Sequence, residues 1–107
     1  MAKKKPTARA ARRADARAAA KLADKRERLA ELEAGGAPSR PVALESASQV
    51  EVHARSLRCP RCDGAYRIDD HAAETIEGAR LRVVRMTCAA CGARRTVYFR
   101  LAPPLLH

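Results

Sequence analysis

The chain has 107 residues, of which 22 are basic and 12 are acidic, so its formal net charge is +10. This length allows one domain at most, and a set of two Tyr, one Phe and no Trp excludes a large hydrophobic core. No segment approaches the roughly 20 apolar residues of a membrane span, and no apolar run follows the charged start of the chain. We therefore expect no secretory leader, no membrane partner and a cytoplasmic location.

The first 36 residues form a basic arm that consists mostly of alanine and charged residues. They hold 11 basic and 5 acidic side chains, against 11 and 7 in residues 37–107. Residues 8–34 include eleven alanines, and alanine has the highest helix propensity. Gly35-Gly36 supplies the left-handed conformation that commonly ends a helix. We therefore predict that the arm, residues 1–36, is either disordered or a helix from about residue 8 to 34.

The charges and leucines of this arm are distributed unevenly. Lysine and arginine crowd its N-terminal half, which the helix dipole disfavours, so an anionic partner would relieve repulsion there. Leu22, Leu29 and Leu32 share one helical face. They span about one and a half heptads, which is fewer than the three or four that indicate a coiled coil.

An excess of positive charge indicates anionic partners, with nucleic acid the first candidate. The alternative for the arm is a solvated, fraying tail, and arginines beside a thiolate-bound metal can simply offset its negative charge. Under the first interpretation, the side chains assigned to phosphate contacts are Lys3, Lys4, Lys5, Arg9, Arg12, Arg13, Arg17, Lys21, Arg94 and Arg95.

The rest of the chain divides into a linker and a β-rich domain. Residues 37–49 are rich in small residues and proline, which predicts a flexible linker. Residues 50–107 form the second predicted domain, where apolar and polar residues begin to alternate. Strands are predicted at residues 50–54, 65–69, 79–87 and 93–101, with a polar loop at 70–78.

Four cysteines carry the strongest chemical signal. Cys59, Cys62, Cys88 and Cys91 follow the spacing C-x2-C-x25-C-x2-C. Thiols stay reduced in the cytosol, and Zn²⁺ prefers four such ligands in a tetrahedron. Four protein ligands leave no open position, so we expect one structural Zn²⁺. A Cys₄ iron site and a redox dithiol pair are the alternatives. Gly64 and Gly92 follow the paired cysteines, where a sharp turn favours permissive backbone.

Other potential ligands and nucleophiles are interpreted as surface residues. The cysteines already complete the metal shell, so His53, His71 and His107 are predicted to lie on the surface. A group of four carboxylates could hold Mg²⁺, but an exposed polar loop is the commoner arrangement; it consists of Asp69, Asp70, Glu74 and Glu77. No nucleophile–base set or glycine-rich phosphate loop is present, so we expect neither an enzyme nor a small-molecule substrate.

The segment LRCPRCDGAYR…MTCAACGARRTVYFRL resembles the zinc-ribbon superfamily, over residues 50–101. The resemblance implies a three- or four-stranded antiparallel sheet with two zinc knuckles, preceded here by the basic arm. The transcript-cleavage members of that superfamily carry an Asp-Glu pair at a hairpin tip, and this chain lacks it. A transcript-cleavage role is therefore not expected. The basic arm instead indicates a protein that binds nucleic acid or a nucleoprotein complex. The alternative is an adaptor whose ribbon docks a partner protein and whose arm is a tether.

Overall fold

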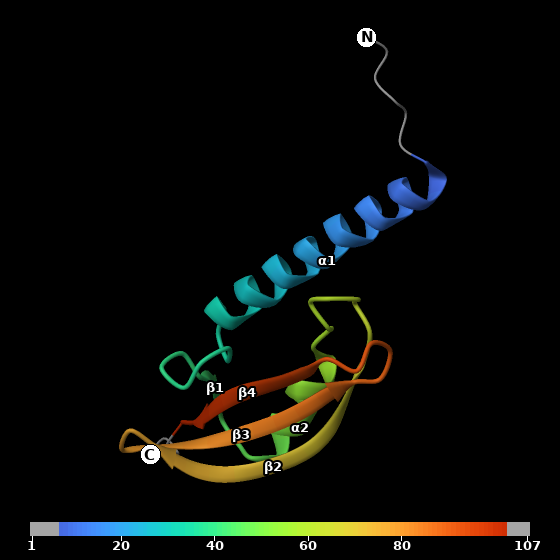
Figure 1. The fold of residues 1–107 in the computed structure, drawn as a ribbon. Coiled ribbons are helices and arrows are strands. Elements are labelled where there is room, and N and C mark those ends of the chain that lie inside the picture. The colour runs from blue at the N-terminus through green and yellow to red at the C-terminus, as the bar shows by residue number, and fades with distance from the viewer. Residues whose placement is uncertain (1–6, 103–107) are drawn as a thin grey trace, which may run out of the picture.

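The computed structural model describes residues 7–102, and Figure 1 shows how its elements are arranged. Lys3, Lys4, Lys5 and His107 lie outside the described residues. In chain order the elements are α1 (Ala8–Leu32), β1 (Val42–Leu44), α2 (Ser48–Ser56), β2 (Tyr66–Ile76), β3 (Ala79–Cys88) and β4 (Arg94–Leu101).

Helix α1 confirms the predicted helix of the arm, although it ends two residues earlier than expected. Its start is fixed by Thr7, whose Oγ1 accepts a hydrogen bond from the backbone N–H of Ala10 at 3.1 Å. After the helix, the carbonyl of Gly35 accepts a hydrogen bond from the backbone N–H of Tyr98 at 2.9 Å. This bond ties the end of α1 to β4. The N-terminal half of α1 extends beyond the sheet (Figure 1).

The four strands form one sheet in the order β1-β4-β3-β2. The pairs β2–β3 and β3–β4 are antiparallel, whereas β1 runs parallel to β4, with Val42 opposite Phe99. The sheet is therefore mixed rather than wholly antiparallel. The segment expected to be a flexible linker, residues 37–49, contains β1 and the first two residues of α2.

The prediction of a strand at residues 50–54 was wrong, because these residues lie in α2. The helical spacing of Val50 and Ala54 places both side chains in the core, whereas Val52, between them, is 69% exposed. Just before the helix, the Gln49 side chain accepts hydrogen bonds from the backbone N–H groups of Glu45 at 3.0 Å and Ser46 at 3.3 Å.

The prediction of a polar loop at residues 70–78 was also wrong, because β2 continues through most of this segment. Its carboxylates pair across the sheet: Arg85 on β3 donates to Asp70 at 3.1 Å and to Glu74 at 2.9 Å. The loop is reduced to a two-residue turn in which Glu77 and Gly78 have φ values of +50° and +81°. Two consecutive residues with positive φ are typical of a type I′ hairpin turn.

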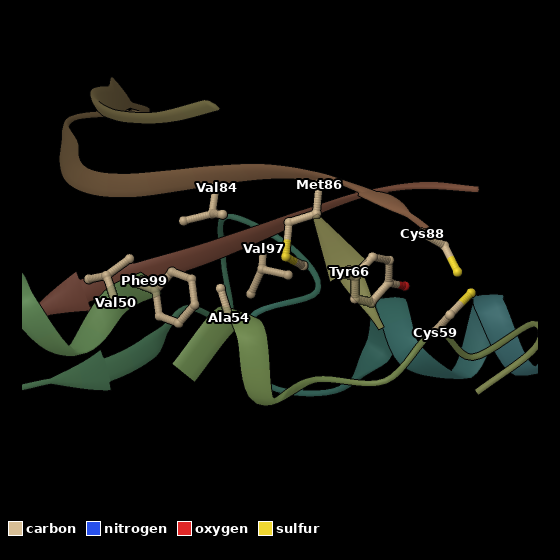
Figure 2. Packing of buried hydrophobic residues seen from close by; sticks show 9 residues of the cluster. All are labelled: Val50, Ala54, Cys59, Tyr66, Val84, Met86, Cys88, Val97 and Phe99. Carbon is tan, nitrogen blue, oxygen red and sulfur yellow. The ribbon is translucent and has the colours of Figure 1, made fainter. Parts of the chain in front are cut away.

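The core lies between α2 and the face of the sheet that it covers (Figure 2). Phe99, Val50 and Val84 are fully buried there. Tyr66 and Cys88 extend the same cluster toward the cysteine end of the sheet. Tyr66 and Phe99 are the two aromatic side chains of this core. Within the described residues, neither helix is long and apolar enough to span a membrane.

Candidate metal centre

The four cysteines lie at one end of the sheet, in two loops with the same backbone hydrogen bonds. In the loop from Cys59 to Gly64, the N–H of Cys59 donates to the carbonyl of Gly64 at 2.9 Å, and the N–H of Asp63 donates to the carbonyl of Cys59 at 2.7 Å. In the loop from Cys88 to residue 93, the N–H of Cys88 donates to the carbonyl of Ala93 at 2.8 Å. The N–H of Gly92 donates to the carbonyl of Cys88 at 2.9 Å.

Each loop needs one residue in the left-handed region, directly after its second cysteine. In the second loop this residue is Gly92, with φ of +78°, as the sequence predicted. In the first loop it is Asp63, with φ of +63°, and not Gly64. Aspartate is among the few residues other than glycine that adopt this conformation readily.

Gly64 is needed for a different reason, which is the lack of space beside its Cα. A Cβ at this position would lie 2.9 Å from the Sγ of Cys88 and 3.1 Å from the Sγ of Cys62. It would also lie 2.9 Å from the Cβ of Ala90. Glycine therefore allows the first loop to approach the sulfur atoms of both loops.

The four sulfur atoms lie within 4.8 Å of one another, which is close enough to hold one metal ion. The Sγ atoms of Cys59 and Cys91 are 3.7 Å apart, and those of Cys62 and Cys88 are 3.4 Å apart. A tetrahedron with metal–sulfur bonds of about 2.3 Å has sulfur–sulfur edges of about 3.8 Å. Both cross-loop distances are close to this edge, so the donor set fits a tetrahedral thiophilic ion.

Hydrogen bonds shift the pKa values of Cys88 and Cys62 in opposite directions. The backbone N–H of Cys91 points at the Sγ of Cys88 at 3.5 Å, and this donor lowers the pKa of Cys88 to about 6. The hydrogen bond between the thiols of Cys62 and Cys88 raises the pKa of Cys62 to about 12. A thiolate is the form that binds metal, and a backbone N–H donor favours that form at Cys88.

The surroundings of the sulfur atoms are partly apolar. Cys59 and Cys88 are buried, while Cys62 and Cys91 are exposed. Tyr66 packs beside the buried pair (Figure 2), and burial together with a hydrogen bond to Cys59 raises its pKa to about 12. The guanidinium of Arg95 lies over the Tyr66 ring, 6.0 Å from its centroid. The site is therefore shielded on the side of the core and open to solvent on the other.

His53 and His71 are half-buried, and neither belongs to the cluster of potential metal ligands. His53 packs edge-on against Phe99, with the ring centroids 5.4 Å apart. The Nδ1 atom of His71 lies 3.6 Å from a carboxylate oxygen of Glu51 on α2. Both histidines thus pack between α2 and the sheet, which differs from their predicted surface position.

Arg61, in the first cysteine loop, connects that loop to α1. Its guanidinium donates to Asp24 at 2.7 Å and to Glu27 at 3.2 Å, and these hydrogen bonds raise its pKa. Asp24 and Glu27, in the C-terminal half of α1, therefore have a partner in the first cysteine loop. Sequence reasoning missed this contact, because it joins residues more than 30 positions apart.

The predicted phosphate-contacting residues fall into two separate places. Arg9, Arg12, Arg13, Arg17 and Lys21 are exposed on the N-terminal half of α1. Arg94 and Arg95 instead line a groove of about 400 Å³ between the other half of α1 and β4. Glu27 and Glu31 of α1 line the same groove. The structure thus does not bring the two sets together.

Comparison of the chain with protein-family models, with curated proteins and with solved structures found no match. The cysteine geometry is compatible with a zinc ribbon. Assignment of a metal and a function to this fold therefore depends on the residues themselves.

Proposed function

We propose that this chain is a zinc-ribbon protein that binds nucleic acid or a nucleoprotein complex through the N-terminal half of α1. One structural Zn²⁺ bound by Cys59, Cys62, Cys88 and Cys91 joins the two cysteine loops as zinc knuckles. The support for zinc is the four-sulfur donor set, two sulfur–sulfur distances near a tetrahedral edge and the absence of a fifth ligand among the described residues. The reducing cytoplasm would keep these thiols available.

The observation that carries the binding proposal is the segregation of charge along α1. Residues 8–21 hold five basic side chains and one acidic side chain, whereas residues 22–32 hold three of each. The acidic side chains Asp24 and Glu27 both form salt bridges with Arg61. The basic half extends away from the ribbon (Figure 1) and carries four net positive charges over about 21 Å of helix. Duplex DNA presents a phosphate about every 3.4 Å on each strand.

The test is fluorescence anisotropy with labelled DNA and RNA oligonucleotides at several salt concentrations. Each phosphate contact contributes a slope of about −0.9 in log K against log salt for duplex DNA, and about −0.7 for a single strand. The double variant Arg13→Gln/Arg17→Gln should lower both the affinity and this slope. The matched control Arg80→Gln/Arg100→Gln removes the same charge from exposed positions on β3 and β4.

The proposal fails if neither nucleic acid binds at low salt, or if the control variant weakens binding as much as the arm variant. Capture of a partner protein that survives nuclease treatment and deletion of residues 1–34 would instead favour the adaptor. Native mass spectrometry of the untreated protein tests the metal independently, through the mass of one bound ion. A mass other than that of zinc would overturn the zinc assignment.

A further inference from the structure

A continuous seam of small, apolar and charged residues runs along the side of α1 that is turned away from the ribbon. It follows alternating spacings of three and four residues, which place side chains on one helical face. Its members are Ala8, Ala11, Asp15, Ala18, Leu22, Lys25, Leu29 and Leu32. The three leucines are 49%, 61% and 65% exposed, respectively. These are three of the four large apolar side chains that the described residues leave exposed.

The ribbon leaves most of this seam uncovered, and Leu32 is the member that also lines the groove between α1 and β4. At 3.6 residues per turn, the centre of the seam lies about 160° around the helix from Asp24, Glu27 and Ala30. Asp24 and Glu27 bind Arg61, and Ala30 is the buried residue of α1. A second helix could therefore lie along the seam while both ribbons remain on the outer sides of the pair.

The residue types along the seam match a second copy of the same helix in antiparallel orientation. A two-fold axis opposite residue 20 pairs position i with position 40 − i of the other copy. Ala18 then meets Leu22 of the second copy, Ala11 meets Leu29, and Ala8 meets Leu32. Each contact joins a small residue with a large one, so the helices interlock without two leucines colliding or two alanines leaving a gap.

The same register also pairs the two charged members of the seam. Asp15 of one copy lies opposite Lys25 of the other, and the symmetry produces this pair twice. In a parallel pair, Asp15 would face Asp15 and Lys25 would face Lys25. A shift of one heptad places Asp15 opposite Leu32, or places the two C-terminal leucines opposite residues that precede α1. Charge and size complementarity therefore select one orientation and one register.

We infer that the protein forms an antiparallel homodimer through this face of α1, with Asp15 of each copy paired with Lys25 of the other. Residues 8–32 carry eight basic and four acidic side chains, so the two helices repel each other overall. Salt screens that repulsion and strengthens apolar association. Dimerisation should therefore increase with salt concentration, whereas binding to nucleic acid should decrease, and this difference separates the two proposals.

The experiment is sedimentation equilibrium of the full-length, nuclease-treated, metal-bound protein over a range of protein and salt concentrations. Leu29→Glu should raise the dissociation constant of the dimer by at least about tenfold, since it places a charge in the seam. Asp15→Lys and Lys25→Asp should each do the same through like-charge contacts. The double variant Asp15→Lys/Lys25→Asp restores opposite charges and should restore the dimer. Val52→Glu, at an exposed position on α2, is the matched control.

Helix content measured by circular dichroism shows whether each variant keeps α1. The inference is overturned if the wild-type chain stays monomeric up to millimolar concentration in high salt. It is also overturned if Leu29→Glu leaves the dimer unchanged, or if the double variant is as weak as the single ones. A monomer that uses Leu29 to capture a different protein would equally contradict it.

Discussion

Replacement of Gly64 by alanine is expected to weaken metal binding through steric contact alone. The backbone at this position is not in the left-handed region, so alanine adds no φ penalty. The new Cβ would lie 2.9 Å from the Sγ of Cys88, 3.1 Å from the Sγ of Cys62 and 2.9 Å from the Cβ of Ala90. Two of these three atoms are proposed metal ligands, and a bound ion would hold them in place, so the first loop itself must shift.

Overpacking of one methyl group into a close-packed site costs about 1–3 kcal/mol. In small metal-dependent domains, the free energy of metal binding is coupled to folding. The affinity of the variant for Zn²⁺ should therefore fall by about five- to 150-fold, since each 1.4 kcal/mol corresponds to about tenfold. The loss should appear in the dissociation constant and should leave the stoichiometry at one ion per chain.

The assay is competition for zinc with a chromogenic chelator at constant pH. Gly92→Asn is the matched control in the second loop, because its Cβ would meet no heavy atom within 4 Å. Asparagine also tolerates the φ of +78° found there. The control should retain nearly the wild-type affinity. If Gly64→Ala binds zinc as tightly as the wild type, the close approach of the two loops described above is incorrect.

Three further results are expected. Arg61→Ala should speed amide hydrogen exchange in the second half of α1 and leave zinc affinity unchanged, whereas Arg55→Ala should alter neither. Phe99→Ala should destabilise the domain by about 3–5 kcal/mol in chemical denaturation, because the ring is fully buried, and a loss below about 1 kcal/mol would contradict this packing. Thr87→Val should raise the pKa of Asp69 measured by NMR, since a hydrogen bond from Thr87 is the main cause that lowers it. Because that pKa is lowered on folding, the stability contributed by Asp69 is present above its ordinary value of 3.8 and is lost as the pH falls through the folded value.

The features that the sequence predicted are those encoded by local spacing. The spacing C-x2-C-x25-C-x2-C predicted a shared site, and the structure brings the four sulfur atoms together. Residues 79–87 and 93–101 were predicted as strands, and β3 and β4 confirm both. Alternation that continues over the length of a whole strand, next to a glycine turn, matches the period of a strand and not that of a helix.

The predictions that failed depended on short sequence patterns or on contacts between residues far apart in the chain. The five residues 50–54 alternate as a strand would, but Val50 and Ala54 also have helical spacing, and contact with the sheet favoured the helix. The S-x-x-Q sequence that ends at Gln49 was the signal that could have identified this helix start. The strand at residues 70–76 was missed because its acidic residues depend on Arg85, which lies on the next strand. The pairing of Arg61 with α1 required the helix position, which no local pattern supplies.

The β2–β3 hairpin also has a kinetic consequence for the metal site. The Glu77–Gly78 turn closes one end of its ladder, and Tyr66 lies opposite Cys88 at the other end. A hairpin that nucleates at its turn forms within about 1–10 μs and delivers Cys88 beside the strand that follows the first cysteine pair. Much of the loop-closure entropy between the two pairs is then lost before any ion arrives. Two residues at the far end of the hairpin, neither of which belongs to the cysteine cluster, thus help to bring the two cysteine pairs together.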